Sequence, residues 1–179
     1  VDVIAGRGRL ADRNTIEVKS KDGSARVKGG KIILATGSEP LKLKGFPFDG
    51  KTVITSDEAL QLDAIPASAL IVGGGYIGAE WASIFNGLGA EVAVGEMMDQ
   101  LLPRSDADLA QELLRAFKRN KIKVSLKTKV ESVEVKNGVA TCALSDGKTV
   151  TAEKVLVSVG RAMNSVGLGL EEAGVKIEN

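Results

Sequence analysis

Six consecutive residues near the middle of the chain have the composition of a phosphate-binding turn. Gly73-Gly74-Gly75-Tyr76-Ile77-Gly78 follow the apolar run Ala69–Val72, and Glu96 stands 18 residues after Gly78. A glycine-rich turn between a strand and a helix lets the backbone approach a pyrophosphate, which then faces the unpaired N–H groups of the helix N-terminus. A carboxylate at the end of the next strand can accept the hydroxyls of a ribose. The pattern predicts a dinucleotide site, and the alternative is a glycine-rich turn with an unrelated acid.

The three spaced glycines have different predicted tasks. Gly73 permits the tight turn, Gly75 has no side chain to block a pyrophosphate, and Gly78 lets the helix pack closely on the sheet. Glu96 would hydrogen-bond a free 2′-hydroxyl and repel a 2′-phosphate, which favours NAD(H) over NADP(H). The nearest following arginine is Arg104, which we place on a solvated loop.

Residue types that are rare or missing restrict the chemistry further. The chain contains no histidine, and Cys142 is its one cysteine. A histidine relay, an internal disulfide, a C-x-x-C pair and a cysteine zinc site are therefore excluded within this chain. Cys142 stands in the strand-like run Val139–Leu144, which predicts a small buried thiol. We expect no catalytic residue and no metal ligand here.

Composition indicates a globular protein of one domain or slightly more. The 179 residues are 44% hydrophobic and 26% charged, with 24 basic and 23 acidic residues and a formal net charge of +1. This balance gives no electrostatic sign of nucleic-acid or anionic-membrane binding. No stretch reaches the roughly 18 apolar residues of a membrane span, and no signal peptide is recognisable. Because the sequence starts at Val1 without methionine and ends without a helix stop, we expect a fragment of a longer chain.

The elements that must position these residues follow from periodicity and turn signals. Residues 39–56 carry prolines and Gly45 and read as a connection, and Ser56 is expected to cap a short helix. Asn137-Gly138 and Asp146-Gly147 predict hairpins, and Gly89 a helix end. The predicted strands are Val1–Ile4, Thr15–Lys19, Ala25–Val27, Lys31–Ala35, Ala69–Val72, Glu91–Gly95, Ile122–Leu126, Val130–Val135, Val139–Leu144, Thr149–Thr151 and Lys154–Val159. The Gly6-Arg7-Gly8 stretch is predicted as a turn.

Two longer helices complete the pattern. One should span Tyr76–Leu88, and Ser105–Asp108 should cap the other, which runs to about Asn120. Their apolar faces are predicted to comprise Ile77, Trp81, Ile84, Phe85 and Leu88 in the first helix, and Leu109, Leu113, Leu114 and Phe117 in the second. The fold class is α/β: a Rossmann-like parallel sheet with helices on both faces and a small antiparallel β-meander, plus a β-rich tail of another domain.

In this order the motifs resemble those of a known family. Gly73–Glu80, Glu96, Ala35-Thr36-Gly37-Ser38 and Val159-Gly160-Arg161 are similar to the motifs of the pyridine nucleotide–disulfide oxidoreductases. The chain looks most like the NAD-dependent dihydrolipoamide dehydrogenase branch, the flavoprotein component of 2-oxo acid dehydrogenase complexes. Two departures are that Arg161-Ala162-Met163-Asn164 replaces the family's arginine-arginine-proline-asparagine, and that Gly95 stands where a bulkier residue is usual.

The resemblance implies a domain organisation and two cofactors. Residues 1–40 would be the C-terminal part of an FAD-binding domain, 41–56 a connection, 57–165 the NAD-binding domain, and 166–179 the start of the return to the FAD or central domain. The residues implied for NAD are Gly73, Gly74, Gly75, Tyr76, Ile77, Gly78, Ala79, Glu80, Glu96, Val130 and Gly160. Those implied for FAD are Gly8, Thr36, Gly37 and Ser38.

For two of these residues a plainer interpretation stays open. Glu80 is expected in the first helical turn, either near the nicotinamide or as an acid favoured by the helix dipole. Gly8 either contacts FAD or is a turn glycine.

The resemblance also implies an activity for the complete enzyme. Dihydrolipoamide would reduce a disulfide, electrons would pass to FAD, and a hydride would pass to NAD⁺. This chain would bind the small-molecule dinucleotide and position its nicotinamide, with weak NAD(H) binding and no turnover alone. The complete protein would be a homodimer associated with a 2-oxo acid dehydrogenase complex, in a bacterial cytoplasm or, alternatively, a mitochondrial matrix.

Three alternatives remain at this stage. One is an NADPH-linked disulfide reductase related to glutathione, trypanothione or mercuric reductase, against which the uncharged Met97-Met98 argues. Another is a flavoprotein NADH dehydrogenase or oxidase. The third is a non-catalytic NAD(H)-binding module, which would have no need of Ala35-Thr36-Gly37-Ser38.

Overall fold

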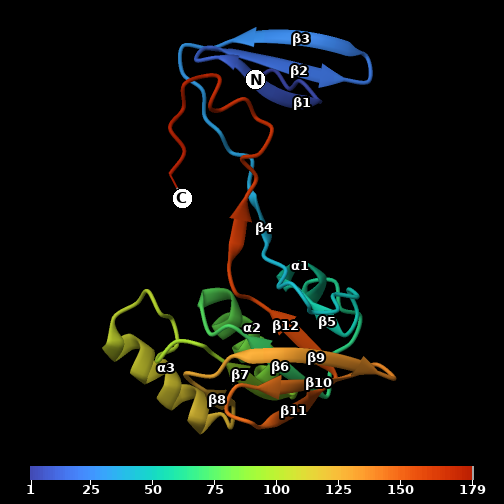
Figure 1. Ribbon diagram of the computed structural model, residues 1–179, viewed down its shortest axis with the longest axis vertical. Coiled ribbons are helices and arrows are strands. Elements are labelled where there is room, and N and C mark those ends of the chain that lie inside the picture. Colours follow the sequence, from blue (N-terminus) through green and yellow to red (C-terminus); the bar gives the residue numbers. More distant parts are fainter. Residues whose placement is uncertain (179) are drawn as a thin grey trace. The chain divides into compact units, whose positions relative to one another are not determined.

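A computed structural model describes residues 1–178, in two units. The first unit comprises Val1–Glu39 together with the residues from Met163 onward, and the second comprises Pro40–Ala162. The chain passes from one to the other at β4 (Ser38–Pro40) and β13 (Arg161–Met163), which pair as a two-stranded sheet (Figure 1). None of the described helices is long and apolar enough to cross a membrane.

A parallel sheet of five strands forms the centre of the second unit (Figure 1). Because all its recorded pairings are parallel, the carboxyl ends of the strands meet at one edge. Central strand β6 is in register with both neighbours, so that Val72 pairs with Gly95 and with Val157. The strands, in their spatial order, are β5 (Val53–Ile54), β12 (Lys154–Val157), β6 (Ser68–Val72), β7 (Glu91–Gly95) and β8 (Lys123–Ser125).

The two faces of this sheet have different covers. Ala69 and Ile71 of β6 face a core shared with helices α1 (Ser56–Ala59), α2 (Tyr76–Gly87) and α3 (Ala107–Arg119). On the opposite face Leu70 and Val72 pack with an antiparallel sheet of three strands, β9 (Val130–Lys136), β10 (Val139–Leu144) and β11 (Thr149–Ala152). The α/β fold class is confirmed. The described helices cover one face only, because the apolar side of the meander covers the other.

The buried faces of α2 and α3 carry smaller residues than predicted. In α2 the buried residues are Gly78, Ala79, Ala82 and Phe85, whereas Ile84 and Leu88 are 46% and 56% exposed. Small side chains let the helix approach the strands closely, so the larger ones lie to the side. In α3, Ala110 and Phe117 are buried and Leu113 and Leu114 partly so, but Leu109 is 62% exposed.

One predicted helix cap differs from the one observed, and the N-cap of the longer helix lies within its predicted range. Thr55, not Ser56, is the N-cap of α1, and its hydroxyl accepts the N–H of Asp57 at 3.2 Å. The carboxylate of Glu58 in turn accepts the N–H of Thr55 at 2.8 Å, which completes a capping box. The T-x-x-E spacing could have identified this cap. The N-cap of α3 is Asp106, and no side chain caps that helix.

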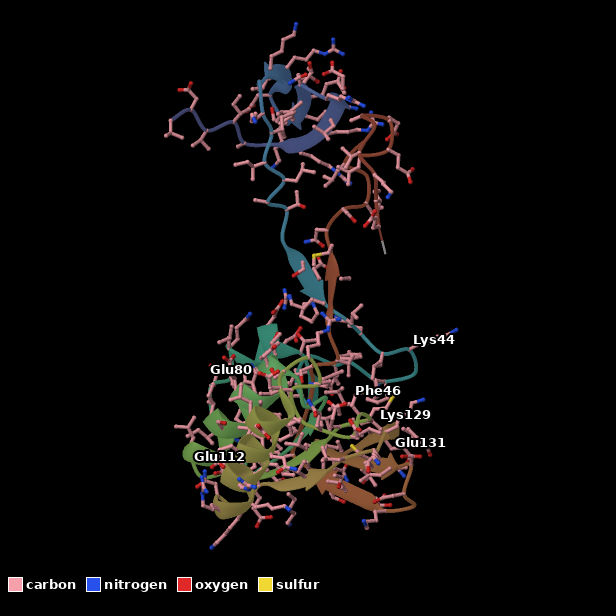
Figure 2. The ribbon with its side chains drawn as sticks, turned by 90° about the vertical axis from the view of Figure 1, so that its left-hand side faces the viewer. Lys44, Phe46, Glu80, Glu112, Lys129 and Glu131 are labelled. Carbon is pink, nitrogen blue, oxygen red and sulfur yellow. The ribbon has the colours of Figure 1, made fainter. Side chains whose placement is uncertain are left out.

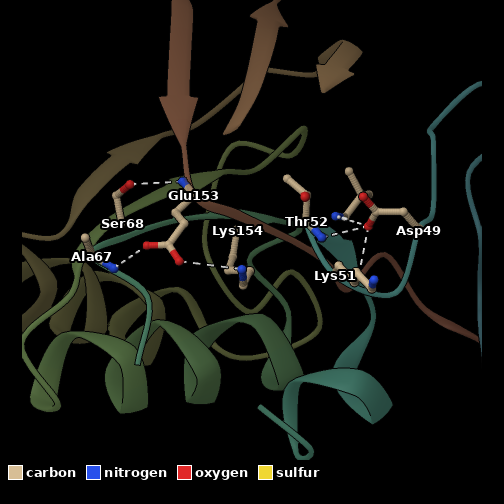
Figure 3. Close-up of polar contacts among 8 residues, drawn as sticks. Asp49, Lys51, Thr52, Ala67, Ser68, Glu153 and Lys154 are labelled. Atoms are coloured by element: carbon tan, nitrogen blue, oxygen red, sulfur yellow. Dashed lines mark hydrogen bonds and ion pairs between the residues drawn. The ribbon is translucent and has the colours of Figure 1, made fainter. Parts of the chain in front are cut away.

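Carboxylates hold the starts of three sheet strands in place (Figure 3). Oδ1 of Asp49 accepts backbone N–H groups from residues 51, 52 and 53 at 2.9, 2.7 and 2.9 Å, which orients the entry to β5. Glu153 accepts the N–H of Ala67 at 2.8 Å, and its own N–H donates to Oγ of Ser68 at 3.1 Å. These two bonds join the starts of β6 and β12.

The first unit is built on an antiparallel sheet of β1 (Arg7–Asp12), β2 (Thr15–Ser20) and β3 (Gly23–Lys28). Its small core contains Leu10, Leu170 and Ala173, so residues near the C-terminus pack on the strands. The N–H of Leu10 donates to the carbonyl of Leu168 at 2.8 Å.

Two predicted strands are not present in this unit. Val1–Ile4 forms no strand, and β1 begins at Arg7, inside the segment predicted as a turn. Lys31–Ala35 is not a strand either, and Ile33 is 90% exposed. A strand needs a neighbour to satisfy its N–H and C=O groups. Within residues 1–178 no strand pairs with either apolar segment.

Candidate functional site

The site predicted from the motifs lies at the carboxyl edge of the parallel sheet. The glycine turn follows β6, Glu96 follows β7, and Ser158 to Gly160 follow β12. These three strands are direct neighbours, so the sheet itself brings the three segments together. Ligands of open α/β sheets bind outside this edge.

Steric restraints at the turn require glycine at two positions. Gly73 has φ +100°, and a Cβ there would lie 2.7 Å from the carbonyl oxygen of Ser158. At Gly78 a Cβ would lie 1.9 Å from the carbonyl oxygen of Gly73 and 2.7 Å from Oγ of Ser158. Gly75 differs, because a Cβ there would have no atom within 4 Å. The space beside Gly75 is therefore open.

The N-terminus of α2 presents free hydrogen-bond donors toward this space. Gly75 is the N-cap, and no side chain caps the helix. The first helical bond runs from the N–H of Ala79 to the carbonyl of Gly75 at 2.8 Å. For the N–H groups of residues 75–78 the described part of the chain supplies no recorded acceptor. An anion beside Gly75 would meet these donors and the positive end of the helix dipole.

Gly74 is held differently from its neighbours. Its N–H donates to Oε2 of Glu96 at 2.6 Å, and its carbonyl accepts the N–H of Leu102 at 2.8 Å. A Cβ at this position would lie 2.6 Å from Cδ2 of Leu101. Gly74 therefore has its polar groups occupied within the protein.

Glu96 is buried, with 6% of its surface exposed, and makes four hydrogen bonds. Its main chain donates to Ser125 and accepts from Thr128, each at 2.9 Å. Its carboxylate accepts the N–H of Gly74 through Oε2 and the N–H of Met98 through Oε1, the latter at 2.7 Å. An ionised carboxylate has about four acceptor positions, so about two remain for ribose hydroxyls. This arrangement fits the adenosine half of a dinucleotide.

Val130 and Gly160 border the same edge. Val130 is buried, and its Cγ2 would lie 3.3 Å from a Cβ added at Gly95, the residue before Glu96. A bulkier residue at position 95 would therefore press on Val130. Gly160 has φ +132°, and its carbonyl accepts the N–H of Leu41 at 3.0 Å.

The remaining residues of the predicted set lie on α2. Tyr76 is 59% exposed, Ile77 is half-buried, and Ala79 is buried against the sheet. Glu80, labelled in Figure 2, is exposed. Because α2 begins at Tyr76, Glu80 is its fifth residue, and the first turn contains no acid. The prediction that placed Glu80 in the first turn was wrong by one position.

Thr36 and Gly37 are fastened to Asn164, all within the first unit. The hydroxyl of Thr36 donates to the carbonyl of Asn164 at 2.8 Å, and Nδ2 of Asn164 donates to the carbonyl of Thr36 at 3.2 Å. The N–H of Asn164 also donates to the carbonyl of Gly37 at 3.0 Å. Ser38 opens β4. Asn164 had no role predicted from the sequence.

Gly8 is separate from that segment and is not a turn glycine. It lies within β1 and pairs with Val18 of β2. A Cβ at Gly8 would meet Ile16 at an ordinary 3.5 Å, and its φ is not positive. Among the described residues no recorded contact joins Gly8 to Thr36, Gly37 or Ser38.

Sequence reasoning missed several residues that shape the turn. Oγ of Ser158 donates to the carbonyls of Val72 and Gly73 at 3.2 and 3.1 Å. Met98 and Leu102 act through their backbone N–H groups, as shown above. Main-chain donors leave no signature in residue type, so no motif could have revealed them.

The thiol of Cys142 is buried, as predicted. Cys142 is fully buried, and burial raises its pKa to about 11. A neutral thiol without access to solvent is neither a nucleophile nor a metal ligand.

A glycine turn, open helix donors and a buried acid at the carboxyl edge of a parallel sheet are typical of α/β domains that bind nucleotides. The chain belongs to the pyridine nucleotide-disulphide oxidoreductases, whose family pattern matches residues 1–179.

Curated relatives of the chain are oxidoreductases. It is 39% identical to a dihydrolipoyl dehydrogenase of Bacillus subtilis over 193 aligned positions, which cover 100% of this chain and 41% of that protein. It is 36% identical to a leghemoglobin reductase of Glycine max, covering 99% and 35%. An Arabidopsis thaliana relative, 36% identical with coverage of 99% and 36%, is a mitochondrial dihydrolipoyl dehydrogenase. The chain thus spans about two-fifths of the length of the bacterial relative.

Solved structures of flavoprotein reductases share the fold. LpdA of Mycobacterium tuberculosis superposes with a TM-score of 0.87 and 31% identity, covering 98% of this chain and 40% of that one. The HOCl-induced flavoprotein disulfide reductase RclA of Escherichia coli superposes with a TM-score of 0.82 and 27% identity, covering 99% and 40%.

Proposed function

We propose that the chain is the NAD(H)-binding portion of a dihydrolipoamide dehydrogenase-like flavoprotein. The observation that carries this proposal is the buried carboxylate of Glu96, fixed beside an open helix N-terminus. Its free acceptor positions would bind the adenine ribose, and the N–H groups of residues 75–78 would bind the pyrophosphate. Val130 would give the adenine an apolar wall, with Gly160 approaching from the neighbouring strand.

Further along α2, the remaining residues of the set would serve the nicotinamide half. Tyr76 and Ile77 begin the helix beside the proposed pyrophosphate position, Ala79 packs the helix on the sheet, and exposed Glu80 would lie near the nicotinamide ribose. Gly73, Gly74 and Gly78 would shape the turn.

Cofactor preference follows from the charge of Glu96. A 2′-phosphate would meet this buried carboxylate, and like charges at close range are unfavourable. Titration of the chain with NADH and with NADPH, followed by calorimetry, tests this. We expect NADH to bind about tenfold more tightly or better. Equal or tighter binding of NADPH would contradict the proposal.

In the longer protein the flavin would supply hydride transfer to the nicotinamide. This chain would bind and orient the acceptor, which removes the entropic cost of bringing the two together. Residues 57–165 would form the NAD-binding domain, and residues 1–40 would form the end of an FAD-binding domain. In that part Thr36, Gly37, Ser38 and, on β1, Gly8 would contact the flavin. Residues 41–56 would connect the two domains, and 166–179 would return toward the FAD domain.

Activity, assembly and location extend the same proposal. The chain alone should bind NADH and give no NAD⁺ reduction with dihydrolipoamide, because Cys142 is its one thiol and is buried. The longer protein would be a homodimer of a 2-oxo acid dehydrogenase complex in a bacterial cytoplasm. The likeness to RclA favours a second candidate, a disulfide reductase with another substrate. Assays of the longer protein with dihydrolipoamide and with other disulfides distinguish the two.

A further inference from the structure

The loop between β7 and α3, residues 96–106, holds the middle of the glycine turn from two sides. Glu96, at its start, accepts the N–H of Gly74 at 2.6 Å. Leu102, in its middle, donates its N–H to the carbonyl of Gly74 at 2.8 Å, while the side chain of Leu101 closes on the Cα. Both polar groups of Gly74 are thus fixed by one loop.

The backbone of this loop is strained where it meets Gly74. Leu102 has φ +48°, a left-handed conformation that a bulky residue rarely adopts, and Pro103 follows it. The N–H of Ser105 and Nε2 of Gln100 donate to the carbonyl of Leu102, at 2.8 and 3.4 Å. Nε2 of Gln100 also donates to the carbonyl of Ser105 at 3.0 Å. Such conformations persist where the surroundings fix them and are common at ligand sites.

On its other side the loop is tied to the connection between β8 and β9. Thr128 donates its N–H to the carbonyl of Glu96 at 2.9 Å, and Lys127 donates to the carbonyl of Met98 at 2.8 Å. Lys127 also has a left-handed backbone, with φ +53°. Glu96 is therefore a junction at which three connections meet.

We propose that Glu96 has a second task as a positioning residue. With Leu102 it fixes Gly74, and this keeps the N–H groups of residues 75–78 directed at one point. The inference rests on the proposed function, in which that point holds the pyrophosphate. Without the carboxylate, the N–H groups of Gly74 and Met98 would lose their acceptor, and the turn would rearrange to satisfy them. Glu96 would then influence phosphate groups that it never touches.

Two nucleotides separate ribose binding from positioning. ADP carries the ribose hydroxyls that Glu96 is proposed to accept, and 2′,3′-dideoxy-ADP lacks them but keeps the diphosphate. We would measure the affinity of both for the chain and for its Glu96→Ala variant by calorimetry. We expect Glu96→Ala to lower the affinity for dideoxy-ADP about fivefold or more, and the affinity for ADP by a larger factor.

A conservative variant and a spectroscopic signal exclude a general loss of structure. Glu96→Gln keeps one acceptor oxygen, so it can hold one of the two N–H groups and should restore part of the dideoxy-ADP affinity. In ¹⁵N–¹H spectra the short bond to a charged acceptor should shift the Gly74 amide proton downfield, and Glu96→Ala should remove that shift. Glu131→Ala, an exposed acid on β9 (Figure 2), is the matched control and should change neither affinity.

The outcomes keep this inference distinct from the proposed function. If Glu96→Ala lowers the affinity for ADP but leaves the affinity for dideoxy-ADP and the chemical shift of the Gly74 amide unchanged, the positioning role is wrong and ribose binding stands. If the unaltered chain binds neither nucleotide, the proposed function itself fails, and the inference fails with it. If Glu96→Ala does not fold, dideoxy-ADP affinity of Glu96→Gln equal to that of the unaltered chain overturns the positioning role.

Discussion

Two glycines of one turn are needed for different reasons, which a motif does not distinguish. At Gly75 an added Cβ meets no atom, whereas at Gly78 it would lie 1.9 Å from a carbonyl oxygen. Gly75→Ala should leave the midpoint temperature of unfolding nearly unchanged. It should lower the affinity for NADH about tenfold, because the methyl group would occupy the space proposed for the phosphate. Gly78→Ala should instead lower the free energy of unfolding by about 3 kcal/mol.

Thermal unfolding and NADH titration of both variants check this contrast. Normal binding of NADH by Gly75→Ala would show that the phosphate does not lie beside Gly75. A Gly78→Ala protein of full stability would show that α2 can move away from the sheet at little cost.

Asp49 should make the stability of the protein depend on pH, because its carboxylate accepts hydrogen bonds from backbone N–H groups. Partial burial acts to raise its pKa, but hydrogen bonds from the N–H groups of residues 51–53 outweigh it and hold the pKa below its ordinary value. A lowered folded-state pKa stabilises the protein above the unfolded-state pKa, and this contribution is lost as pH falls through the folded-state pKa.

Asp49→Asn tests that contribution. The amide oxygen still accepts hydrogen bonds but carries no charge, so we expect a loss of about 0.5–1 kcal/mol at pH 7, small because the carboxyl is solvent-exposed. Urea unfolding of the two proteins from pH 7 to pH 3 should show the difference shrinking as pH falls. A difference that stays constant would exclude a charge effect.

Among single residues, the sequence predicted those whose role depends on the type of side chain. Gly73, Gly78 and Glu96 lie together as their spacing indicated. The donors from Met98 and Leu102 could not be predicted, because they are backbone groups placed by a strained loop. The Glu96 carboxylate bonds both the turn after β6 and its own loop, two segments that are separated in the sequence.

The C-terminal ends of α2 and α3 have the same capping motif, but different residues occupy its left-handed position. Ala90 N–H donates to Phe85 carbonyl, and Ile122 N–H to Phe117 carbonyl, each at 2.9 Å, as in a Schellman cap. The left-handed residue is Gly89 after α2, with φ +100°, but Lys121 after α3, with φ +62°.

Exchange of these residues should change stability in opposite directions. Lys121→Gly should raise the free energy of unfolding by about 0.5–1 kcal/mol, because glycine adopts this conformation without the side-chain penalty. Gly89→Ala should lower it by about 1 kcal/mol. Urea unfolding measures both, and NADH affinity of Lys121→Gly should be unchanged. A destabilised Lys121→Gly would mean that the lysine side chain makes an unrecognised contact.

Among the elements, those with local signals were predicted well. The strands and helices of the parallel sheet and the meander match their predicted ranges closely, since Gly and Asn-Gly signals mark their ends. The exception is the edge strand β5, which lies in the segment predicted as a connection. Val1–Ile4 and Lys31–Ala35 have strand-like composition, but composition alone does not supply a neighbouring strand. The predicted apolar face of α2 was correct for Trp81 and Phe85 and wrong for Ile84 and Leu88, because close packing on the sheet selects alanine and glycine over larger residues.

At the scale of the molecule, the two units have cores of very different size. Leu10, Leu170 and Ala173 form the buried cluster of the first unit, whereas two large clusters cover both faces of the parallel sheet in the second. Amides of β1, β2 and β3 should therefore exchange with deuterium faster than those of β6, β7 and β12. Hydrogen exchange followed by mass spectrometry checks this, and equal protection would show that the units open together.

The single thiol reports the opening of the second unit. Cys142 is fully buried in β10, and burial raises its pKa to about 11, so a disulfide reagent must wait for the sheet to open. Labelling at pH 8 should be at least about a hundredfold slower in buffer than in denaturant. Saturating NADH should slow it further if NADH binds the native state. Rapid labelling in buffer would show that the meander leaves the sheet easily.

The two hydrogen bonds that the Glu96 carboxylate accepts have a consequence for protein engineering. A designer who wished this domain to accept a phosphorylated cofactor would first replace the acid with a small or cationic side chain. That exchange would remove the acceptor on which the neighbouring main-chain amides depend, so it would damage the anion cradle while admitting the new anion. A successful conversion should require a second substitution that returns an uncharged oxygen to those amides.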